Sequence, residues 1–263
     1  MTPGTEAPTT PRPGTGAPGE AKVRPFDAPF ATVPTAHYKL AQTVAGIAVR
    51  ESDMAGFFGE PGTGKTYALS EFCRGSAVES VYVTATPSPT RKEIFEEILR
   101  GVGVSVADAS ARELRHRCEE VLSETPRIVV IDECQHLSYV WHQQLRALHD
   151  RPDARFALLL AGGANAVRVL KRDQQLASRV SMQVHFAPLG GQELLEVLHA
   201  FHPVLANTSD ELLVEIDRKD CRGNLRRWHT FTRLSLNLLP QSSTPDRLSR
   251  KVVRAVLTLR GES

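Results

Sequence analysis

The chain has 263 residues, 41% of them hydrophobic and 24% charged, which are the proportions of an ordinary soluble globular protein. Its formal net charge of +2 points to no particular partner, and its length allows one large domain or two small ones. No apolar run approaches the roughly eighteen residues of a membrane span, and the N-terminus lacks the basic-then-apolar layout of a secretion signal. Four scattered cysteines without a Cys-x-x-Cys pair favour a reducing compartment, so we expect a cytoplasmic protein with no membrane partner.

The first 24 residues are dominated by Pro, Gly, Thr and Ala. Such a segment buries too little apolar surface to offset its ordering entropy, so we expect a disordered tail over residues 1–24. Helices and strands then alternate. Apolar spacing predicts helices at 35–49, 67–73, 90–99, 107–122 and 139–149, and strands at 54–58, 80–85, 127–131, 156–161 and 182–186.

The pattern changes near residue 190. From there only helices are predicted, at 192–200, 209–216, 224–238 and 245–259. Strands that alternate with helices imply βαβ units, and the β-branched run within 127–131 is typical of a central parallel strand buried on both faces. We therefore predict an α/β fold, with a parallel sheet flanked by helices over residues 25–189 and a small all-helical domain over residues 190–263.

One short stretch carries the strongest functional signal. Residues 59–66 read Gly-Glu-Pro-Gly-Thr-Gly-Lys-Thr and fit the phosphate-binding loop pattern G-x-x-x-x-G-K-[ST], between a predicted strand and a predicted helix. The glycines let backbone N–H groups turn onto phosphate oxygens, and the following helix presents its positive dipole end to the same anion. In this pattern Lys65 reaches the β- and γ-phosphates, and the Thr66 hydroxyl binds Mg²⁺. The predicted ATP contacts are Gly59, Glu60, Pro61, Gly62, Thr63, Gly64, Lys65, Thr66 and Tyr67.

The second half of a nucleotide site follows the strand at 127–131. Asp132 lies at the tip of that strand, where a carboxylate can hold Mg²⁺ through water. Glu133 is then placed to act as the general base on the attacking water. Two acidic residues also suit the first turn of a helix, but the phosphate loop favours the catalytic interpretation.

Together the two motifs resemble those of the AAA+ ATPases, over about residues 35–260. The string Asp-Glu-Cys-Gln-His-Leu at 132–137 is similar to the D-E-[AC]-[QH]-H-[LI] signature of the transposition-regulator ATPases, the TniB, TnsC and phage Mu B group. Related strings occur in bacterial secretion ATPases. The resemblance implies a P-loop NTPase fold with a helical lid, ATP and Mg²⁺ as cofactors, a homo-oligomeric ring or filament on double-stranded DNA, and a transposase as partner.

The resemblance also implies roles for residues outside the two motifs. Arg179 precedes the last predicted strand, where AAA+ proteins carry an arginine finger aimed at a neighbour's γ-phosphate. Arg226 opens a lid helix at the place of the second sensor, and Arg227 competes with it for that role. Either side chain would spread positive charge over the transferring phosphoryl group. The first sensor is usually a polar residue at the tip of the fourth strand. Here the only polar candidate is Asn165, which follows the predicted strand end at residue 161 by four residues. The expected catalytic set is Glu133, Arg179 and Arg226.

Other interpretations of these residues stay open. Arg179 also suits a surface ion pair, and Arg226 also suits a DNA contact or a solvated position. Gln135 and His136 directly follow the catalytic pair. They either relay the nucleotide state to a partner or serve in capping and core packing.

Basic residues gather near the C-terminus, where residues 218–260 hold eleven Arg and Lys against two Asp. Such an excess attracts a polyanion, although a solvated helical surface explains it equally well. Because no recognition helix of a known type is apparent, we expect sequence-tolerant binding through DNA phosphates. The candidate DNA contacts are Arg91 and Lys92, at the start of the helix at 90–99, and a set on one side of the final predicted helix: Arg247, Arg250, Lys251 and Arg254.

Three functions remain open. The first is an ATP-dependent DNA-binding regulator that assembles on DNA and directs a transposase. The second is a P-loop kinase, which would share the phosphate loop but have no use for Glu133 and Arg179. The third is a nucleotide-gated switch or secretion-type ATPase that acts on protein partners without DNA. Only the basic residues and the family resemblance separate the third function from the first.

Overall fold

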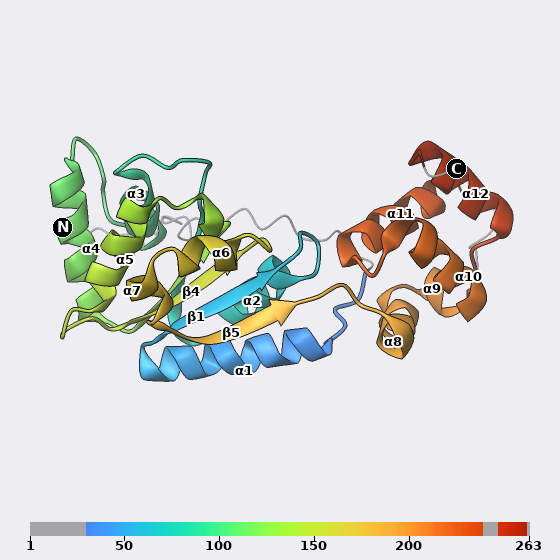
Figure 1. The fold of residues 1–263 in the computed structure, drawn as a ribbon, viewed down its shortest axis with the longest axis horizontal. Helices are drawn as coiled ribbons and strands as arrows, with labels where there is room; N and C mark the ends of the chain where they lie inside the picture. Colours follow the sequence, from blue (N-terminus) through green and yellow to red (C-terminus); the bar gives the residue numbers. More distant parts are fainter. Residues whose placement is uncertain (1–29, 239–246, 262–263) are drawn as a thin grey trace, which may run out of the picture.

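The computed structural model describes residues 30–238 and 247–261 (Figure 1). The predicted tail at residues 1–24 and residues 245–246 of the final predicted helix lie outside the described residues. Within the described part of the chain, no helix combines the length and the apolar character needed to cross a membrane.

The core is a five-stranded sheet in which neighbouring strands run parallel, in the order β2-β3-β4-β1-β5. Because the strands are parallel, their carboxyl ends meet at one edge of the sheet, where ligands of open α/β sheets bind. The strands span β1 (Met54–Gly59), β2 (Glu79–Thr84), β3 (Arg127–Asp132), β4 (Phe156–Gly162) and β5 (Val180–Phe186).

Helices cover both faces of the sheet and complete a three-layered core (Figure 1). One apolar cluster joins the sheet to α1 (Ala36–Glu51) and α2 (Lys65–Gly75). A second cluster joins the opposite face to five helices, which are α3 (Glu93–Gly101), α4 (Ala111–Glu124), α5 (Tyr139–His149), α6 (Ala166–Lys171) and α7 (Gln174–Ala177).

Strand residues alternate between these two clusters, as the period-two geometry of a strand requires. In β1, Met54 and Phe58 pack under the second cluster, whereas Ala55 and Phe57 pack under the first. All four are at most 1% exposed. Burial on both faces explains why the central strands β1, β3 and β4 read as near-continuous apolar runs, and the predicted α/β fold with a parallel sheet is confirmed.

After the sheet the described chain forms helices only, in what we call the helical region (residues 191–238 and 247–261). Its elements are α8 (Gly191–Phe201), α9 (Pro203–Ala206), α10 (Asp210–Ile216), a π-helical turn (Asp217–Cys221), α11 (Leu225–Leu238) and α12 (Arg250–Leu259). An apolar cluster of its own holds this region together, with Trp228 and Phe231 of α11 fully buried. The predicted all-helical C-terminal part is therefore present, while its boundary at residue 190 stays a prediction.

The sequence analysis missed α6, α7 and α9, because six residues or fewer show too little of a helical period. Three predicted helix starts are wrong by three residues or more. α4 begins at Ala111 rather than at residue 107, because the Ser110 side chain caps it by accepting the Glu113 N–H. α3 begins at Glu93 rather than at residue 90, and residues 91–92 form a turn over which the Glu93 carboxylate accepts the Thr90 N–H. α12 begins at Arg250, because the Ser249 side chain caps it by accepting the Val252 N–H. Arg247 therefore precedes the final helix instead of lying on it.

Candidate nucleotide site

The phosphate loop connects the end of β1 to the start of α2, at the carboxyl edge of the sheet. Gly59, Gly62 and Gly64 all have positive φ, at 153°, 85° and 102°. Two of them are also crowded. A Cβ on Gly59 would lie 2.0 Å from the Phe186 carbonyl oxygen, and a Cβ on Gly62 would lie 2.3 Å from the Asn224 side-chain oxygen. The loop therefore needs glycine at these positions for both its backbone conformation and its close packing.

Lys65 begins α2 and folds back over the loop. Its Nζ donates to the carbonyl oxygens of Gly59 at 2.9 Å and Glu60 at 2.8 Å, and the residue is 7% exposed. Burial is the largest cause that lowers the Lys65 pKa, and the nearby Arg226 charge lowers it further, while Asp132 and Glu133 oppose both. An ammonium held inside the curve of a loop, next to a helix N-terminus, fits the triphosphate of a nucleotide.

Asp132 ends β3 beside the first turn of α2. Its Oδ2 accepts the hydroxyls of Thr66 and Tyr82, each at 2.8 Å, and its Oδ1 accepts the Glu133 N–H at 2.8 Å. The structure thus brings together the Thr66 hydroxyl and the Asp132 carboxylate, the two predicted metal ligands, and oxygen donors of this kind fit Mg²⁺. Burial, followed by the Asp132 charge, raises the pKa of Tyr82, which keeps the phenol protonated and able to donate. Sequence reasoning missed Tyr82, whose only signal is its place on the neighbouring strand.

Glu133 has a left-handed backbone, with φ at 54°, and its side chain is exposed. This conformation is uncommon for a residue with a Cβ and concentrates at functional sites. The carboxylate accepts the side-chain amide of Gln135, whose oxygen accepts the Gly163 N–H at 3.0 Å. His136 contacts the Ala85 carbonyl oxygen through Nδ1 at 3.1 Å.

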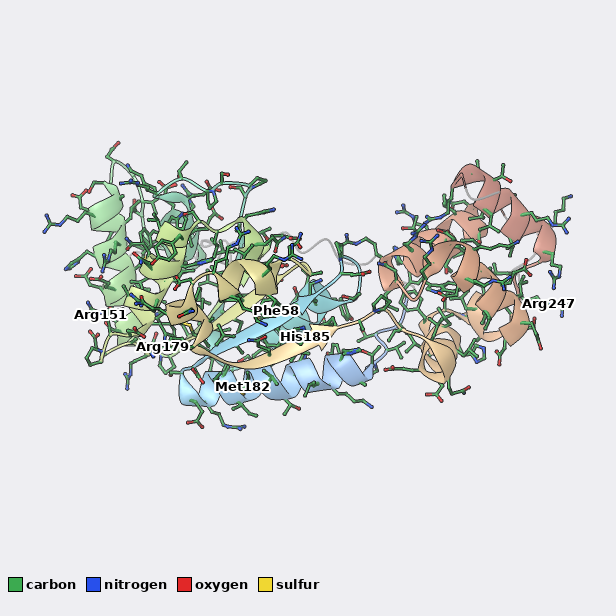
Figure 2. All side chains as sticks on the ribbon, viewed as in Figure 1. Phe58, Arg151, Arg179, Met182, His185 and Arg247 are labelled. Atoms are coloured by element: carbon green, nitrogen blue, oxygen red, sulfur yellow. The ribbon has the colours of Figure 1, made fainter. Side chains whose placement is uncertain are left out.

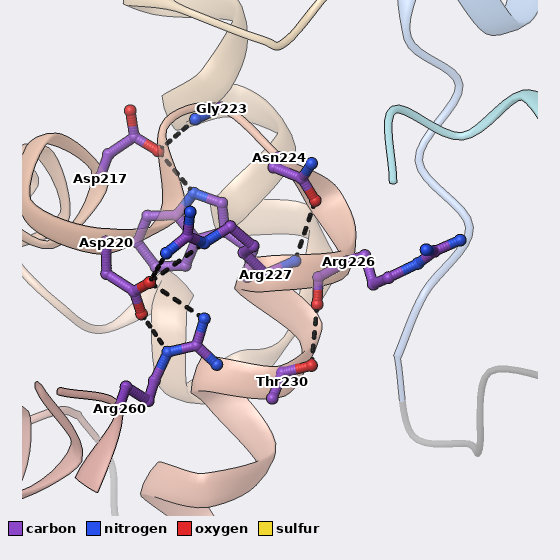
Figure 3. Close-up of polar contacts among 9 residues, drawn as sticks. Asp217, Asp220, Gly223, Asn224, Arg226, Arg227, Thr230 and Arg260 are labelled. Carbon is purple, nitrogen blue, oxygen red and sulfur yellow. Dashed lines mark hydrogen bonds and ion pairs between the residues drawn. The ribbon is translucent and has the colours of Figure 1, made fainter. Parts of the chain in front are cut away.

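The start of α11 docks on the phosphate loop. The Asn224 amide donates to the Pro61 carbonyl oxygen at 2.7 Å, and the Arg226 N–H donates to the Gly62 carbonyl oxygen at 3.2 Å. The next arginine faces elsewhere, because the Arg227 guanidinium donates to Asp220 at 2.7 and 3.1 Å. Figure 3 shows the Arg226 side chain extending away from the ion pairs around Asp220.

Arg179 does not join the phosphate loop of its own chain. It lies at the start of β5, at the end of the core away from the helical region (Figure 2). Its guanidinium makes a two-point ion pair with Asp150, at 2.8 and 3.2 Å, and its side chain is 51% exposed. The hydrogen bond from Arg179 lowers the pKa of the Asp150 carboxyl.

Two other predicted nucleotide contacts, Asn165 and Tyr67, have local contacts that point to no particular role. Asn165 is exposed at the N-cap of α6, where its side chain makes no capping hydrogen bond. Tyr67 lies in the first turn of α2, with its hydroxyl against Thr32 and its ring 6.4 Å from that of Tyr38.

The predicted DNA contacts lie in two separate places. Arg91 and Lys92 precede α3, where the Lys92 ammonium donates to the Ala109 carbonyl oxygen at 2.7 Å. Arg91 borders a hollow between α3, α4 and α5 that Arg112 and Arg115 also line, and sequence reasoning missed these two. The second group is exposed in the helical region, with Arg250 paired to Glu215 at 2.9 Å, and consists of Arg247, Arg250, Lys251 and Arg254.

Comparison with known proteins places this geometry in context. Residues 50–170 match the family model described as AAA domain. The DNA transposition protein B of the Mu-like prophage FluMu of Haemophilus influenzae is 32% identical over 111 residues, which are 41% of this chain and 37% of that protein. The matched stretch thus spans little more than a third of its curated relative.

Solved structures agree on the fold. Cdc6p from Pyrobaculum aerophilum superposes with a TM-score of 0.73 at 18% identity, covering 89% of this chain and 70% of its own. The Orc1 protein of Aeropyrum pernix, solved in complex with DNA, gives a TM-score of 0.67 at 20% identity, with 86% and 64% covered. The RuvB branch migration motor of Thermotoga maritima gives 0.55 at 16% identity, with 84% and 68% covered.

Proposed function

We propose, from the premise that this chain carries an AAA domain on the P-loop AAA+ fold, that it is an ATPase which assembles on DNA and acts in transposition. The observation that carries the ATPase part is the meeting of three groups at one edge of the sheet. These are the Lys65 ammonium inside the loop, the Thr66 hydroxyl and the Asp132 carboxylate. Thr66 and Asp132 are 66 residues apart in sequence, so their contact is made by the fold and not by a local sequence pattern.

ATP and Mg²⁺ both fit the groups present. The loop N–H groups and Lys65 would hold the β- and γ-phosphates, and Thr66 with Asp132 would hold the metal ion. When bound, Mg²⁺ neutralises part of the phosphate charge. Tyr82 keeps the Asp132 carboxylate turned toward Thr66, because its hydroxyl shares the same carboxylate oxygen.

In the proposed reaction a water oxygen attacks the γ-phosphorus while the bond from that phosphorus to the β–γ bridging oxygen breaks. The Glu133 carboxylate takes the proton of the water, and ADP leaves with the bond's electron pair. Arg226 is the better candidate for the second sensor, because its backbone already contacts the loop at Gly62 and its side chain turns away from Asp220. Arg227 is committed to Asp220, which favours a structural role.

Arg179 would act on a neighbouring subunit. The strand register sets Val180 beside Met54 and Phe186 beside Gly59. Six strand steps of about 3.3 Å separate Val180 from Phe186 by about 20 Å, and Arg179 lies one residue further from the loop edge, so its side chain cannot span the distance. A finger at this position therefore requires a second copy of the chain, and this supports a homo-oligomer, as a ring or a filament.

The DNA and transposition parts rest on the relatives and on charge. The curated relative is named a DNA transposition protein, and one structural relative was solved with DNA. Arg91 and Arg112 line one hollow of the core and suit DNA phosphates, while Arg115 beside them is paired with Glu119 at 2.9 Å. We propose sequence-tolerant binding to double-stranded DNA and recruitment of a transposase in the ATP-bound state.

The ATPase proposal is tested by two substitutions. Lys65→Ala removes the side-chain cation of the phosphate loop, so binding of Mg·ATP measured by calorimetry should fall at least about tenfold. Glu133→Gln keeps the shape of the side chain but cannot take a proton, so binding should persist while hydrolysis is lost. Parental ATP affinity in the first variant or parental turnover in the second would refute the assigned role.

The DNA proposal is tested by salt dependence. Neutralising Arg91 and Lys92 together should weaken binding to all sequences alike and reduce the slope of log K against log[salt] by up to about 1.8. Lys39→Ala with Arg50→Ala removes the same charge from α1 and should leave the slope unchanged. An unchanged slope in both doubles, and in a quadruple alanine variant of Arg247, Arg250, Lys251 and Arg254, would favour a switch that acts on proteins instead.

A further inference from the structure

The tip of β4 offers no side chain to the nucleotide site, because the strand ends in Gly162 and continues with Gly163. The Gln135 amide reaches this place from the turn after β3. A Cβ on Gly162 would lie 2.6 Å from the Gln135 side-chain oxygen, so the amide rests directly on the strand end. Glycine at 162 is what allows this approach.

The direction of the Gln135 amide is fixed by its two partners. Its oxygen accepts the Gly163 N–H at 3.0 Å, and its nitrogen donates to the Glu133 carboxylate. The flipped amide would set its NH₂ against the Gly163 N–H and its oxygen against the carboxylate, so both contacts would become repulsive. The bridge from β4 to Glu133 therefore has one orientation.

The bridge is not needed to hold the turn that carries Gln135. This 3₁₀ turn (Cys134–His136) is closed by backbone hydrogen bonds, from the His136 N–H to the Glu133 carbonyl oxygen at 2.9 Å and from the Leu137 N–H to the Cys134 carbonyl oxygen at 3.1 Å. His136 ties the turn to the chain after β2 independently. The turn therefore does not need the Gln135 side chain to stay closed, and the two contacts of that side chain can serve another purpose.

We propose that Gln135 is a positioning residue for ATP hydrolysis, which holds the Glu133 carboxylate in place relative to the end of β4. It supplies from the neighbouring loop the polar group that the glycine tip of β4 lacks. The proposal rests on the ATPase function proposed above. An exposed carboxylate held by one hydrogen bond loses its fixed direction when the donor is removed, and a misdirected base slows proton transfer without touching the groups that bind ATP.

Two substitutions of Gln135, with one control, distinguish its contact with Gly163 from its contact with Glu133. Gln135→Leu removes both contacts and should lower kcat about ten- to a hundredfold, the worth of one hydrogen bond to a charged group, with the Kd for Mg·ATP within about twofold of the parent. Gln135→Glu keeps an acceptor for Gly163 but faces Glu133 with a second carboxylate, so kcat should fall at least as far. Gln143→Leu on α5 is the matched control, because its amide contacts the Tyr139 hydroxyl away from the site, and kcat should not change.

Two readouts tell positioning from mere support of the fold. Hydrogen exchange at the Gly163 amide should speed up in Gln135→Leu and stay slow in Gln135→Glu. In a double-mutant cycle with Glu133→Asp, whose shorter carboxylate still takes a proton but lies one methylene back from the Gln135 amide, Gln135→Leu should cost less activity than it costs in the parent. A parental kcat in Gln135→Leu, a parallel loss of ATP binding, or an additive cycle would overturn the proposal for Gln135 alone. A parent protein that binds but never hydrolyses ATP would instead overturn the ATPase function, and this inference with it.

Discussion

The stability of the helical region should depend strongly on Asp220. It is fully buried in the π-helical turn and lies between two arginines. Its Oδ1 accepts Arg227 at 2.7 Å and Arg260 at 3.0 Å, and its Oδ2 pairs with the Nε of Arg260 (Figure 3). Asp220→Asn keeps the shape of this side chain and removes its charge.

The size of the effect follows from burial. Breaking a buried ion pair by neutralising one partner costs about 3–5 kcal/mol, because the other charge is left uncompensated. Arg227 and Arg260 retain 37% and 16% of their side-chain exposure, so water still reaches part of their charge. We therefore expect the lower end, about 3 kcal/mol of the free energy of unfolding of the helical region.

The assay uses the two tryptophans. Trp141 lies in the core and Trp228 in the helical region, so a Trp141→Phe background leaves a fluorescence signal from the helical region alone. Urea unfolding should show a lower midpoint for Asp220→Asn at unchanged m. Glu215→Gln is the control, since it also removes a carboxylate that pairs with two basic residues, but at the surface, and its midpoint should match the parent. A loss below about 0.5 kcal/mol for Asp220→Asn, the range of ordinary surface changes, would refute the reasoning.

Three further predictions follow from the same geometry. Arg226→Ala should slow ATP hydrolysis at least about tenfold and leave the urea unfolding midpoint unchanged. Arg227→Ala should mainly lower the unfolding midpoint. The opposite pattern would assign the second sensor to Arg227. Gly62→Ala should weaken ATP binding at least about tenfold in calorimetry, because a left-handed position costs about 1–2 kcal/mol with a side chain and the new methyl meets Asn224; parental affinity would contradict the docking of α11 on the loop. Burial lowers the pKa of His142 and His149 below 6.5. Below pH 6.5 the unfolded chain binds protons at these histidines that the folded chain does not bind. The free energy of unfolding is therefore highest above pH 6.5, and below it falls by at most about 1.4 kcal/mol per pH unit for each histidine. Urea melts at pH 7.5 and 5.5 check this, and His142→Asn should flatten the dependence.

The parts of the fold and site that could be predicted are those written in contiguous residues. The phosphate loop is eight successive positions, and Asp132 follows a single apolar run, so local pattern alone locates both. The central strands β1, β3 and β4 were predictable for the same reason, because burial on both faces makes them almost wholly apolar, whereas the edge strands β2 and β5 alternate buried with exposed residues.

The parts that could not be predicted depend on residues that meet only in the folded chain. Tyr82 reaches Asp132 through the register of β2 against β3, and Gln135 meets Gly163 across 28 positions. Asp220 selects Arg227 over Arg226 by the geometry of a π-helical turn, which has no sequence period of its own. No spacing rule distinguishes these partners from other polar residues nearby.

The central claim is that the complete site forms between two copies of the chain, and one mixing experiment tests it most directly. Lys65→Ala subunits should bind ATP only weakly but present Arg179, whereas Arg179→Ala subunits should bind ATP but present no finger. Neither variant should hydrolyse ATP alone at the parental rate. Mixed at constant total concentration, with assembly followed by light scattering, the two should regain hydrolysis, most strongly near equal amounts. No recovery at any ratio, with assembly intact, would contradict a site shared between subunits and leave Arg179 as the partner of Asp150 alone.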